Sequence, residues 1–379
     1  MRIAIDAREL LGRSTGVGRY LRHLLRQWSQ FAAAGTFPHE VLLCAPSEAP
    51  EWVAGELRGL RMRWRAIPGE SGSWWEQVQL PSAIRPEAPD ILFAPAYTAP
   101  LRVDCPVVQT IHDVSFLARP EWFTWRERVR RAWLTKVSAR RARLVLTDSR
   151  FSAEEIHRLI GVPRDRITVI PLGLTAPGLV GEPAATTALL PAVPAPSAGR
   201  RPLVLYVGSI FNRRHVPDLI RAFASVLRRV PDARLEIVGE NRSYPLQDLG
   251  AVCAEAGVAA HVGVRAYVSD DELAGLYRSA RAFAFLSEYE GFGLTPLEAL
   301  NWGVPVVVLD TQVARDTCGP AARYVTLDDP AAISDHLVAL LSDDAAHRRA
   351  LVEAASVLAR YRWDDAARAT QAAIEGAAR

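Results

Sequence analysis

Two glutamates around a glycine-rich turn form the segment of this 379-residue sequence that is best suited to chemistry. Glu290 and Glu298 enclose the run Gly291-Phe292-Gly293-Leu294-Thr295, which follows the apolar stretch Ala282–Leu286. Glycine permits backbone conformations and a close ligand approach that a side chain would forbid. The pattern therefore predicts a bend at the end of a strand where backbone N–H groups and two carboxylates can meet a ligand.

The same segment has the sequence of a helix start. Thr295 is predicted as the N-cap, Pro296 as the first helical residue and Glu298 as the capping-box partner. Unpaired N–H groups and the dipole at such a start favour a phosphate. A plain strand–turn–helix connector would explain the two glycines and Glu298 equally well. It does not explain Glu290, because a carboxylate at the end of a strand gains nothing structural there.

A pair of arginines follows another apolar run. Arg213 and Arg214 lie in the loop that begins at Gly208, directly after Leu203–Val207. Adjacent arginines suit a diphosphate, whose charge must be compensated where water is excluded. An isolated Arg-Arg pair is more often a solvated basic loop. Here the loop and the Glu290 turn both belong at strand ends of one predicted sheet, which favours the diphosphate.

The first half of the chain carries two weaker signals. Gly16 and Gly18 form a G-x-G after the Ile3–Asp6 run, a pattern that is more often an ordinary tight turn. His112 and Asp113 end a second strand, where a His-Asp pair is usually structural. At a carboxyl end that faces a cleft, however, the pair becomes a reasonable polar contact for a sugar.

These residues need a scaffold, and the hydrophobic pattern predicts an α/β fold. Short β-branched runs alternate with helical stretches such as Val17–Phe31 and Ser152–Ile160, the latter opening on the capping-box pattern Ser152-x-x-Glu155. Strand–helix–strand units at this spacing make parallel sheets with right-handed crossovers. The strands expected in the two halves are Ile3–Asp6, Val41–Cys44, Ile91–Phe93, Val107–Thr110, Leu144–Thr147, Ile167–Ile170, Leu203–Val207, Leu235–Val238, His261–Val264, Ala282–Leu286, Val304–Leu309 and Tyr324–Leu327.

The chain is predicted to form two Rossmann-like domains with a cleft between them. Residues 1–175 would form the acceptor-side domain, the proline- and alanine-rich stretch 176–202 a linker, and residues 203–360 the nucleotide-sugar domain. Residues 361–379 are expected to form a helix that crosses back to the first domain. Ligands of such sheets bind outside the carboxyl ends of the strands.

The glycine turn resembles the E-x7-E motif of retaining family-4 glycosyltransferases, which have the two-Rossmann architecture called GT-B. Seven residues separate Glu290 from Glu298, and the flanking run 302–307 is similar to the family too. The resemblance implies that Glu298 holds the donor ribose and that Glu290 contacts the donor sugar at its reacting face. It extends over nearly the whole chain, but the segment 310–315 departs from the family pattern.

The resemblance also implies roles for the remaining candidates. His112 would lie near the transferred sugar, so the catalytic candidates are His112 and Glu290. The acceptor-side loop would comprise Gly16, Gly18 and Asp113, and Tyr267 and Val268 would line the base pocket mainly through backbone atoms. Family members usually carry lysine where this chain has Arg214. The residues implied to bind the donor are Gly208, Arg213, Arg214, Gly291, Phe292, Gly293, Leu294, Thr295 and Glu298.

No D-x-D motif is present, so we expect the diphosphate to be neutralised by arginines and helix dipoles and not by a metal ion. The donor is expected to be a nucleoside-diphosphate sugar, with GDP-mannose preferred and a UDP sugar left open. The acceptor would be a glycan or a lipid-linked glycan. One alternative is a nucleotide-sugar epimerase, which would act on the donor without an acceptor. The other is a non-catalytic nucleotide-sugar-binding subunit, against which Glu290 and Glu298 argue, because binding alone does not need both.

Composition excludes several other classes. Lys136 is the only lysine and follows no glycine-rich loop, which argues against pyridoxal-phosphate and P-loop chemistry. The four cysteines are far apart, so neither a zinc site nor a disulfide framework is expected. A net charge of +3 requires no nucleic-acid partner. With a strand-like N-terminus and no run near ~18 apolar residues, a cytoplasmic enzyme is expected, with peripheral contact at the inner membrane face as an option.

Positive charge is concentrated between Arg119 and Arg143, where the sequence has nine basic residues and only two acidic ones, Glu121 and Glu127. Trp122, Phe123, Trp125 and Trp133 are interleaved with them. A basic aromatic helix of this kind can lie on anionic lipid headgroups. The interpretation that we favour from the sequence is an ordinary domain helix that buries its tryptophans.

Overall fold

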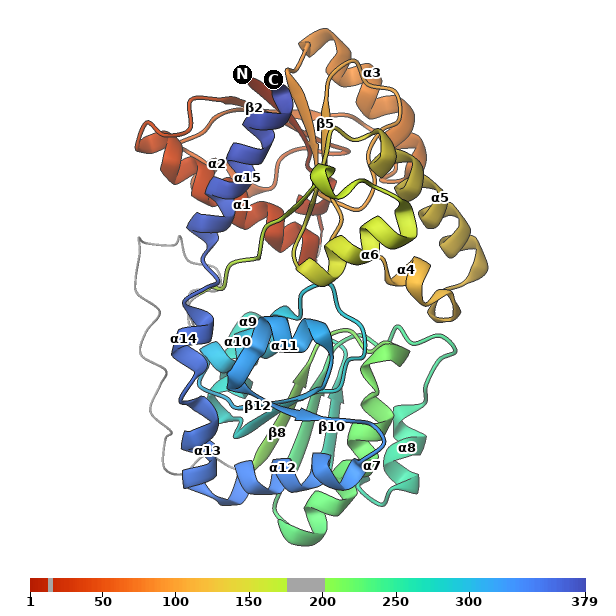
Figure 1. Ribbon diagram of the computed structural model, residues 1–379, viewed down its shortest axis with the longest axis vertical. Coiled ribbons are helices and arrows are strands. Elements are labelled where there is room, and N and C mark those ends of the chain that lie inside the picture. Colours follow the sequence, from red (N-terminus) through yellow and green to blue (C-terminus); the bar gives the residue numbers. More distant parts are fainter. Residues whose placement is uncertain (13–15, 176–201) are drawn as a thin grey trace. The chain divides into compact units, whose positions relative to one another are not determined.

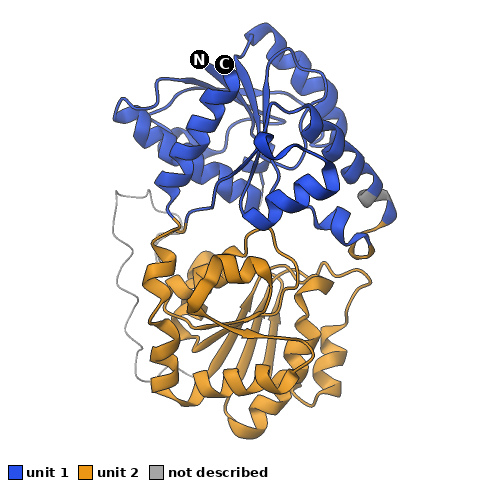
Figure 2. Cartoon of the chain, in the orientation of Figure 1, with its two compact units in different colours: residues 1–120, 125–173, 362–379 blue, residues 121–124, 174–361 orange. Residues whose placement is uncertain are grey.

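The computed structural model describes residues 1–12, 16–175 and 202–379. These residues form two compact units, coloured separately in Figure 2. Unit 1 comprises residues 1–120, 125–173 and 362–379, and unit 2 comprises residues 121–124 and 174–361. The expected linker 176–202 lies outside the described residues except for Pro202.

Unit 1 is built on a seven-stranded sheet in which all described pairs are parallel (Figure 1). Its strands are β1 (Arg2–Asp6), β2 (Glu40–Ala45), β3 (Arg61–Ala66), β4 (Ile91–Ala94), β5 (Val107–Thr110), β6 (Leu144–Thr147) and β7 (Ile167–Val169). They are arranged in the order β3-β2-β1-β4-β5-β6-β7. The order reverses between β1 and β4, so the loops after these strands flank the point where α/β sheets bind ligands.

Helices cover this sheet and close the unit. They are α1 (Gly16–Ala33), α2 (Glu51–Glu56), α3 (Leu80–Ile84), α4 (Ser115–Ala118), α5 (Trp125–Arg141), α6 (Arg150–Ile160) and the C-terminal α15 (Trp363–Ala378). The last of these packs on α1, β4 and β5, and the Trp28 indole donates a hydrogen bond of 3.0 Å to the carbonyl of Ala367. The predicted crossover helix is thus confirmed, because the chain leaves unit 2 at Tyr361 and ends in unit 1.

Strand β3 was not predicted. Its sequence, Arg-Met-Arg-Trp-Arg-Ala, is dominated by arginine, and it forms one edge of the sheet. Arg63 pairs with Glu40 and Glu87, and Arg65 pairs with Glu87, so the charges are carried on a solvated face. The alternation of arginine with other residues is the period-2 pattern of a half-exposed edge strand, and it was the signal available.

Unit 2 repeats the plan with a six-stranded parallel sheet. Its strands are β8 (Leu203–Val207), β9 (Arg234–Val238), β10 (Val262–Arg265), β11 (Ala282–Phe285), β12 (Val306–Leu309) and β13 (Ala322–Val325). Its helices are α7 (Val216–Arg229), α8 (Leu249–Glu255), α9 (Asp270–Ser279), α10 (Leu294–Asn301), α11 (Gln312–Cys318), α12 (Pro330–Ser342), α13 (Asp344–Leu351) and α14 (Ala354–Leu358). The strand order β10-β9-β8-β11-β12-β13 reverses between β8 and β11. The predicted α/β fold with two Rossmann-like sheets is confirmed.

One predicted helix start in unit 1 was wrong. The sequence suggested a capping box from Ser152 to Glu155, but α6 begins at Arg150 and Ser149 is its N-cap. The Ser149 hydroxyl accepts a hydrogen bond of 3.1 Å from the Ser152 backbone N–H. Both serines fit a cap by residue type, and Ser149 has the extended backbone that an N-cap requires.

Candidate active site

The two loops that flank the strand reversal in unit 2 are joined to each other. The loop after β8 carries Arg213 and Arg214, and the loop after β11 carries Glu288 and Glu290. The Glu288 backbone N–H donates a hydrogen bond of 2.9 Å to the Arg213 carbonyl. The topology therefore brings residues that are more than seventy positions apart in the sequence to one edge of the sheet.

An ion pair between Arg214 and Glu290 forms the centre of this cluster. Arg214 Nε donates to Glu290 Oε1 at 2.8 Å, and both side chains are mostly buried, with 12% and 14% exposure. The same carboxylate oxygen accepts a hydrogen bond of 2.8 Å from the Ser287 hydroxyl. Arg214 Nη1 donates to the Ser209 carbonyl, also at 2.8 Å. Glu290 is thus held by groups from both loops.

Gly208 provides the space for the Arg214 side chain. Its φ of +142° lies in a region that favours glycine. A Cβ at this position would stand 2.6 Å from Arg214 Nη1, so the guanidinium would have to move from its present position. The glycine is therefore needed both for the backbone conformation and for the position of the guanidinium.

The arginines keep the Glu290 carboxyl ionised. Burial alone would raise the pKa of Glu290, but Arg214 and Arg213 outweigh it, so this pKa lies below its ordinary value. Burial conversely lowers the pKa of Arg214, and Glu290 more than restores it, leaving it above its ordinary value. The pair is accordingly charged at neutral pH, so a ligand that binds here meets a buried carboxylate.

Arg213 differs from its neighbour. Its side chain is only 8% exposed, and its Nε has no hydrogen-bond partner among the described residues. The guanidinium lies 4.5 Å from the centroid of the Phe211 ring and 5.9 Å from that of Trp122. A buried guanidinium N–H without an acceptor is costly, so this position suits an anionic ligand.

The helix after the glycine turn begins earlier than predicted. Helix α10 starts at Leu294 with Gly293 as its N-cap, and no side chain caps it. Gly293 has φ +85°, the left-handed region that glycine enters without strain, so the chain turns into the helix before Thr295. The predicted Thr295 cap and its capping box with Glu298 were therefore wrong. Glu298 lies half-buried inside the helix.

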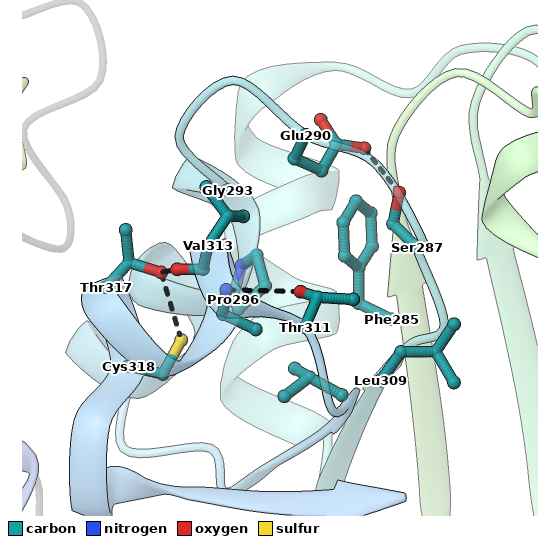
Figure 3. A pocket seen from close by; sticks show the side chains of 12 residues that line it. Phe285, Ser287, Glu290, Gly293, Pro296, Leu309, Thr311, Val313, Thr317 and Cys318 are labelled. Carbon is teal, nitrogen blue, oxygen red and sulfur yellow. Dashed lines mark hydrogen bonds between the residues drawn. The ribbon is translucent and has the colours of Figure 1, made fainter. Parts of the chain in front are cut away.

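A small pocket lies beside the glycine turn (Figure 3). It encloses about 270 Å³ including its open side, and Glu290 and Gly293 both line it. The opposite wall comes from the segment after β12, where Thr311 caps α11 through a 3.2 Å hydrogen bond from the Ala314 N–H. This is the segment whose sequence departs from the family pattern, and Thr311 and Thr317 were not among the predicted site residues.

In unit 1, His112 lies two residues beyond the end of β5 and is held on both sides. Its Nδ1 is 2.7 Å from Asp148 Oδ2, and its Nε2 is 3.1 Å from the Pro95 carbonyl. Tyr20 and Tyr97 pack edge-on against the ring. Because both polar partners are acceptors only, the ring satisfies both when each nitrogen carries a proton. Asp148 follows the neighbouring strand β6, a position that could have indicated this pairing.

The charge of His112 should be visible in its pH dependence. Burial lowers the pKa of His112, but Asp148 outweighs this effect, so the pKa lies above the ordinary 6.5. The stabilisation from the ring proton is therefore complete below pH 6.5 and is lost as the pH rises through the raised folded-state value. We expect Asp148→Asn to lower the pKa of His112, measured by NMR titration of the ring, and to flatten this pH dependence in urea unfolding.

The exposed carboxylate Asp165 provides the control. Asp165→Asn should leave the His112 titration as it is in the unchanged protein. An equal His112 pKa in the Asp148→Asn variant and the unchanged protein would refute the assignment.

The other predicted site residues have mixed surroundings. Asp113 accepts hydrogen bonds from the Ser115 N–H (2.8 Å) and hydroxyl, and from the Tyr97 hydroxyl (3.0 Å), so it holds the start of α4. Gly16 and Gly18 lie in the first turn of α1 and do not form the loop that was expected.

The remaining candidates lie in unit 2. Tyr267 is 73% exposed and Val268 is buried, in the loop before α9. Gly291, Leu294 and Thr295 are half-buried around the glycine turn, whereas Phe292 is buried against Tyr361.

Two further properties concern the described residues as a whole. Among them, no three histidine, cysteine, aspartate or glutamate side chains gather closely enough to hold a metal ion. Every helix in the described part of the chain is too short or too polar to serve as a membrane span.

Comparison with known families gives the reaction class. Residues 14–176 match the model described as Glycosyltransferase Family 4, and residues 194–357 match the model described as Glycosyl transferases group 1. The two matches cover most of both units. The chain belongs to the family-4 glycosyltransferases with the GT-B fold. The resemblance inferred from the Glu290–Glu298 motif is thereby confirmed, and this enzyme is a glycosyltransferase of glycan biosynthesis.

Individual relatives support the family at modest identity. The glycosyltransferase is 29% identical to the O-antigen chain mannosyltransferase B of Escherichia coli, over 75% of this chain and 73% of that protein. It is 32% identical to a D-inositol 3-phosphate glycosyltransferase of Xylanimonas cellulosilytica, over 59% of this chain and 55% of that protein. The match thus spans about half the length of the second relative.

Solved structures share the fold. The glycosyltransferase WaaG, involved in lipopolysaccharide biosynthesis, superposes with a TM-score of 0.70 at 14% identity, covering 99% of this chain and 100% of that one. Anabaena HepE, solved with UDP and glucose, gives 0.70 at 16% identity and covers 99% of both chains.

Proposed function

We propose that this glycosyltransferase binds a nucleoside-diphosphate sugar at the loops after β8 and β11 and transfers the sugar with retention of anomeric configuration. The observation that supports the proposal is the buried pair of Arg214 and Glu290, next to an Arg213 guanidinium whose Nε has no acceptor. A diphosphate would supply that acceptor. In this arrangement Arg213 binds the donor, and Arg214 positions Glu290.

The transfer itself needs few groups from the protein. The bond between the anomeric carbon and the donor phosphate breaks, and the acceptor oxygen forms its bond to the same carbon on the same face. A phosphate oxygen takes the acceptor proton, and the nucleoside diphosphate leaves. Glu290 stabilises the positive charge that develops on the sugar, while Arg213 and the start of α10 stabilise the departing phosphate without a metal ion.

His112 is assigned an orienting role. A ring with a proton on each nitrogen cannot accept the acceptor proton, so His112 does not act as the base. It can donate Nε2–H to a sugar hydroxyl in exchange for the Pro95 carbonyl, which is 3.1 Å away. A contact between His112 and the transferred sugar is what the family resemblance implied.

For the donor we propose mannose from GDP-mannose, and for the acceptor a glycan or lipid-linked glycan. The first relative named above is a mannosyltransferase of O-antigen chains, which supports both choices. The HepE structure contains UDP. Binding of a UDP sugar in place of GDP-mannose would therefore show that both the nucleotide base and the sugar of this proposal are wrong.

Thermal unfolding with a panel of GDP, UDP, GDP-mannose and UDP-glucose tests the donor, because a bound ligand raises stability by mass action. We expect the guanine nucleotides to stabilise the protein most. Incubation of the stabilising donor with oligosaccharide or lipid-linked acceptors should then release the nucleoside diphosphate and leave a glycoside of unchanged anomeric configuration. A new nucleotide sugar formed without acceptor would instead identify an epimerase, and stabilisation without turnover would identify a binding subunit.

A further inference from the structure

The exposed apolar side chains of unit 1 are concentrated in one region. In the described part of this unit, all large apolar residues that are exposed belong to two segments, 74–78 and 125–133. They are Trp74 (70% exposed), Trp125 (67%), Trp133 (60%), Val129 (50%) and Val78 (37%). Three exposed tryptophans in so small a set are unusual, because apolar residues on a surface are normally scattered singly.

The residues on α5 share one face of the helix. Trp125, Val129 and Trp133 follow each other at intervals of four, the spacing that stacks side chains along one side. Figure 1 shows α5 at the edge of unit 1. Arg130 Nη1 lies 3.5 Å from the Ser73 hydroxyl, which joins α5 to the residue that precedes Trp74.

Other side chains of α5 hold the helix against the rest of unit 1. Helix α5 is anchored through its opposite face, where Leu134 and Ser138 are buried. Arg131 adds to the anchor, because its guanidinium lies 4.3 Å from the Tyr97 ring centroid and 4.9 Å from that of Phe116. The interpretation favoured from the sequence, a helix that buries its tryptophans, was therefore wrong for Trp125 and Trp133.

Positive charge accompanies the apolar face. Residues 125–141 contain seven basic residues and one acidic residue, Glu127. Lys136, the only lysine in the chain, lies seven positions after Val129 and so shares its side of the helix. The exposed Arg130 borders the same face. Tryptophan and long basic side chains together fit an interface whose interior is apolar and whose surface is anionic.

We infer that the surface formed by Trp74, Val78, Trp125, Val129 and Trp133, with Arg130 and Lys136, docks on an anionic lipid bilayer. The tryptophans enter the headgroup region and the cations face anionic lipids, which contribute a favourable term for each charge near the membrane. This inference goes beyond the proposed function, because it concerns where the enzyme works and not the transfer step.

Flotation of the full chain with vesicles tests the inference without donor or acceptor, so its failure would leave the transfer reaction untouched. We expect binding to vesicles of equal parts phosphatidylglycerol and phosphatidylcholine, and little binding to phosphatidylcholine alone. Trp125→Ser with Trp133→Ser should lower the partition coefficient at least about tenfold, because the apolar area that each indole buries in the bilayer is lost. Arg130→Gln with Lys136→Gln should lower it roughly fivefold for each charge, on anionic vesicles only.

Two exposed apolar residues of unit 2 provide the matched control. Leu246 and Val352 are 75% and 70% exposed, so Leu246→Ser with Val352→Ser removes comparable apolar exposure elsewhere. This double variant should float like the unchanged protein. Unchanged melting temperatures would verify that all variants fold. The inference is overturned if the unchanged protein does not bind anionic vesicles, if it binds both compositions equally, or if the tryptophan variant floats as well as the control.

Discussion

Glu290→Ala is expected to lower turnover by about two to three orders of magnitude, as is typical when one preorganised group that stabilises transition-state charge is removed. Glu290 is buried, ionised and held by Arg214 and Ser287 at 2.8 Å each, so it needs no reorganisation when the sugar becomes positively charged. Steady-state release of the nucleoside diphosphate measures the effect. Affinity for the nucleoside diphosphate should change little, because the carboxylate is assigned to the sugar.

The alanine variant also leaves Arg214 buried without its counter-ion, which can lower the free energy of unfolding by about 3 kcal/mol or more. Glu290→Gln separates the two effects, because the amide oxygen still accepts from Arg214 while the charge is absent. Glu288→Gln is the matched control in the same loop, since Glu288 lies 3.6 Å from His215 and is not paired with Arg214. Near-normal turnover by a folded Glu290→Gln protein would remove the carboxylate from the mechanism.

Arg213→Ala is expected to weaken binding of the nucleoside diphosphate by about tenfold to a hundredfold, the value of one or two charge-assisted hydrogen bonds. The guanidinium is already buried with Nε unpaired, so most of its desolvation is complete before the ligand arrives. Calorimetric titration of the nucleoside diphosphate measures the loss. Arg213→Lys should recover only part of the affinity, because an ammonium keeps the charge but lacks the planar fork.

Arg221 offers the control for Arg213. It is an exposed arginine on α7 whose guanidinium pairs with Asp218 at 3.0 Å, so Arg221→Ala removes a positive charge without touching the cluster. Its affinity for the diphosphate should equal that of the unchanged protein. Equal affinities for Arg213→Ala and Arg221→Ala would refute the role of Arg213.

Local patterns were sufficient for most of the scaffold. The predicted limits of the strands Val107–Thr110, Leu144–Thr147 and Leu203–Val207 are those observed, because fully buried parallel strands are short apolar runs between polar turns. The start of β13 was misplaced by two residues, and β3 was missed, because an edge strand carries half of its side chains in water. Helix starts were less certain, because the residue type of a cap does not determine where the chain turns into the helix. Helix α10 starts after the left-handed Gly293 and not at Thr295, and α6 starts after the extended Ser149 and not at Ser152.

The candidate site was predictable by residue but not by role. Glycines, arginines and glutamates at strand ends can be recognised from the sequence. Which arginine pairs with Glu290, and which is left with an unpaired N–H, depends on side-chain packing against Gly208 and Phe211. The pairing of His112 with Asp148 likewise brings together residues that follow two different strands. The same holds for the pocket, where Thr311 after β12 lies opposite the turn after β11.

The amino-acid sequence by itself determined the class of this protein: two parallel α/β sheets, a family-4 motif at Glu290–Glu298, and a basic aromatic stretch at 119–143. These features depend on residues that are close together along the chain, so the periodicity and spacing of the sequence indicate them directly. Only the tertiary structure decided that Arg214 holds Glu290, that His112 is shared between two acceptors, and that Trp125 and Trp133 face outward. Those outcomes depend on which distant surfaces come together and on what remains uncovered, and no local pattern records either.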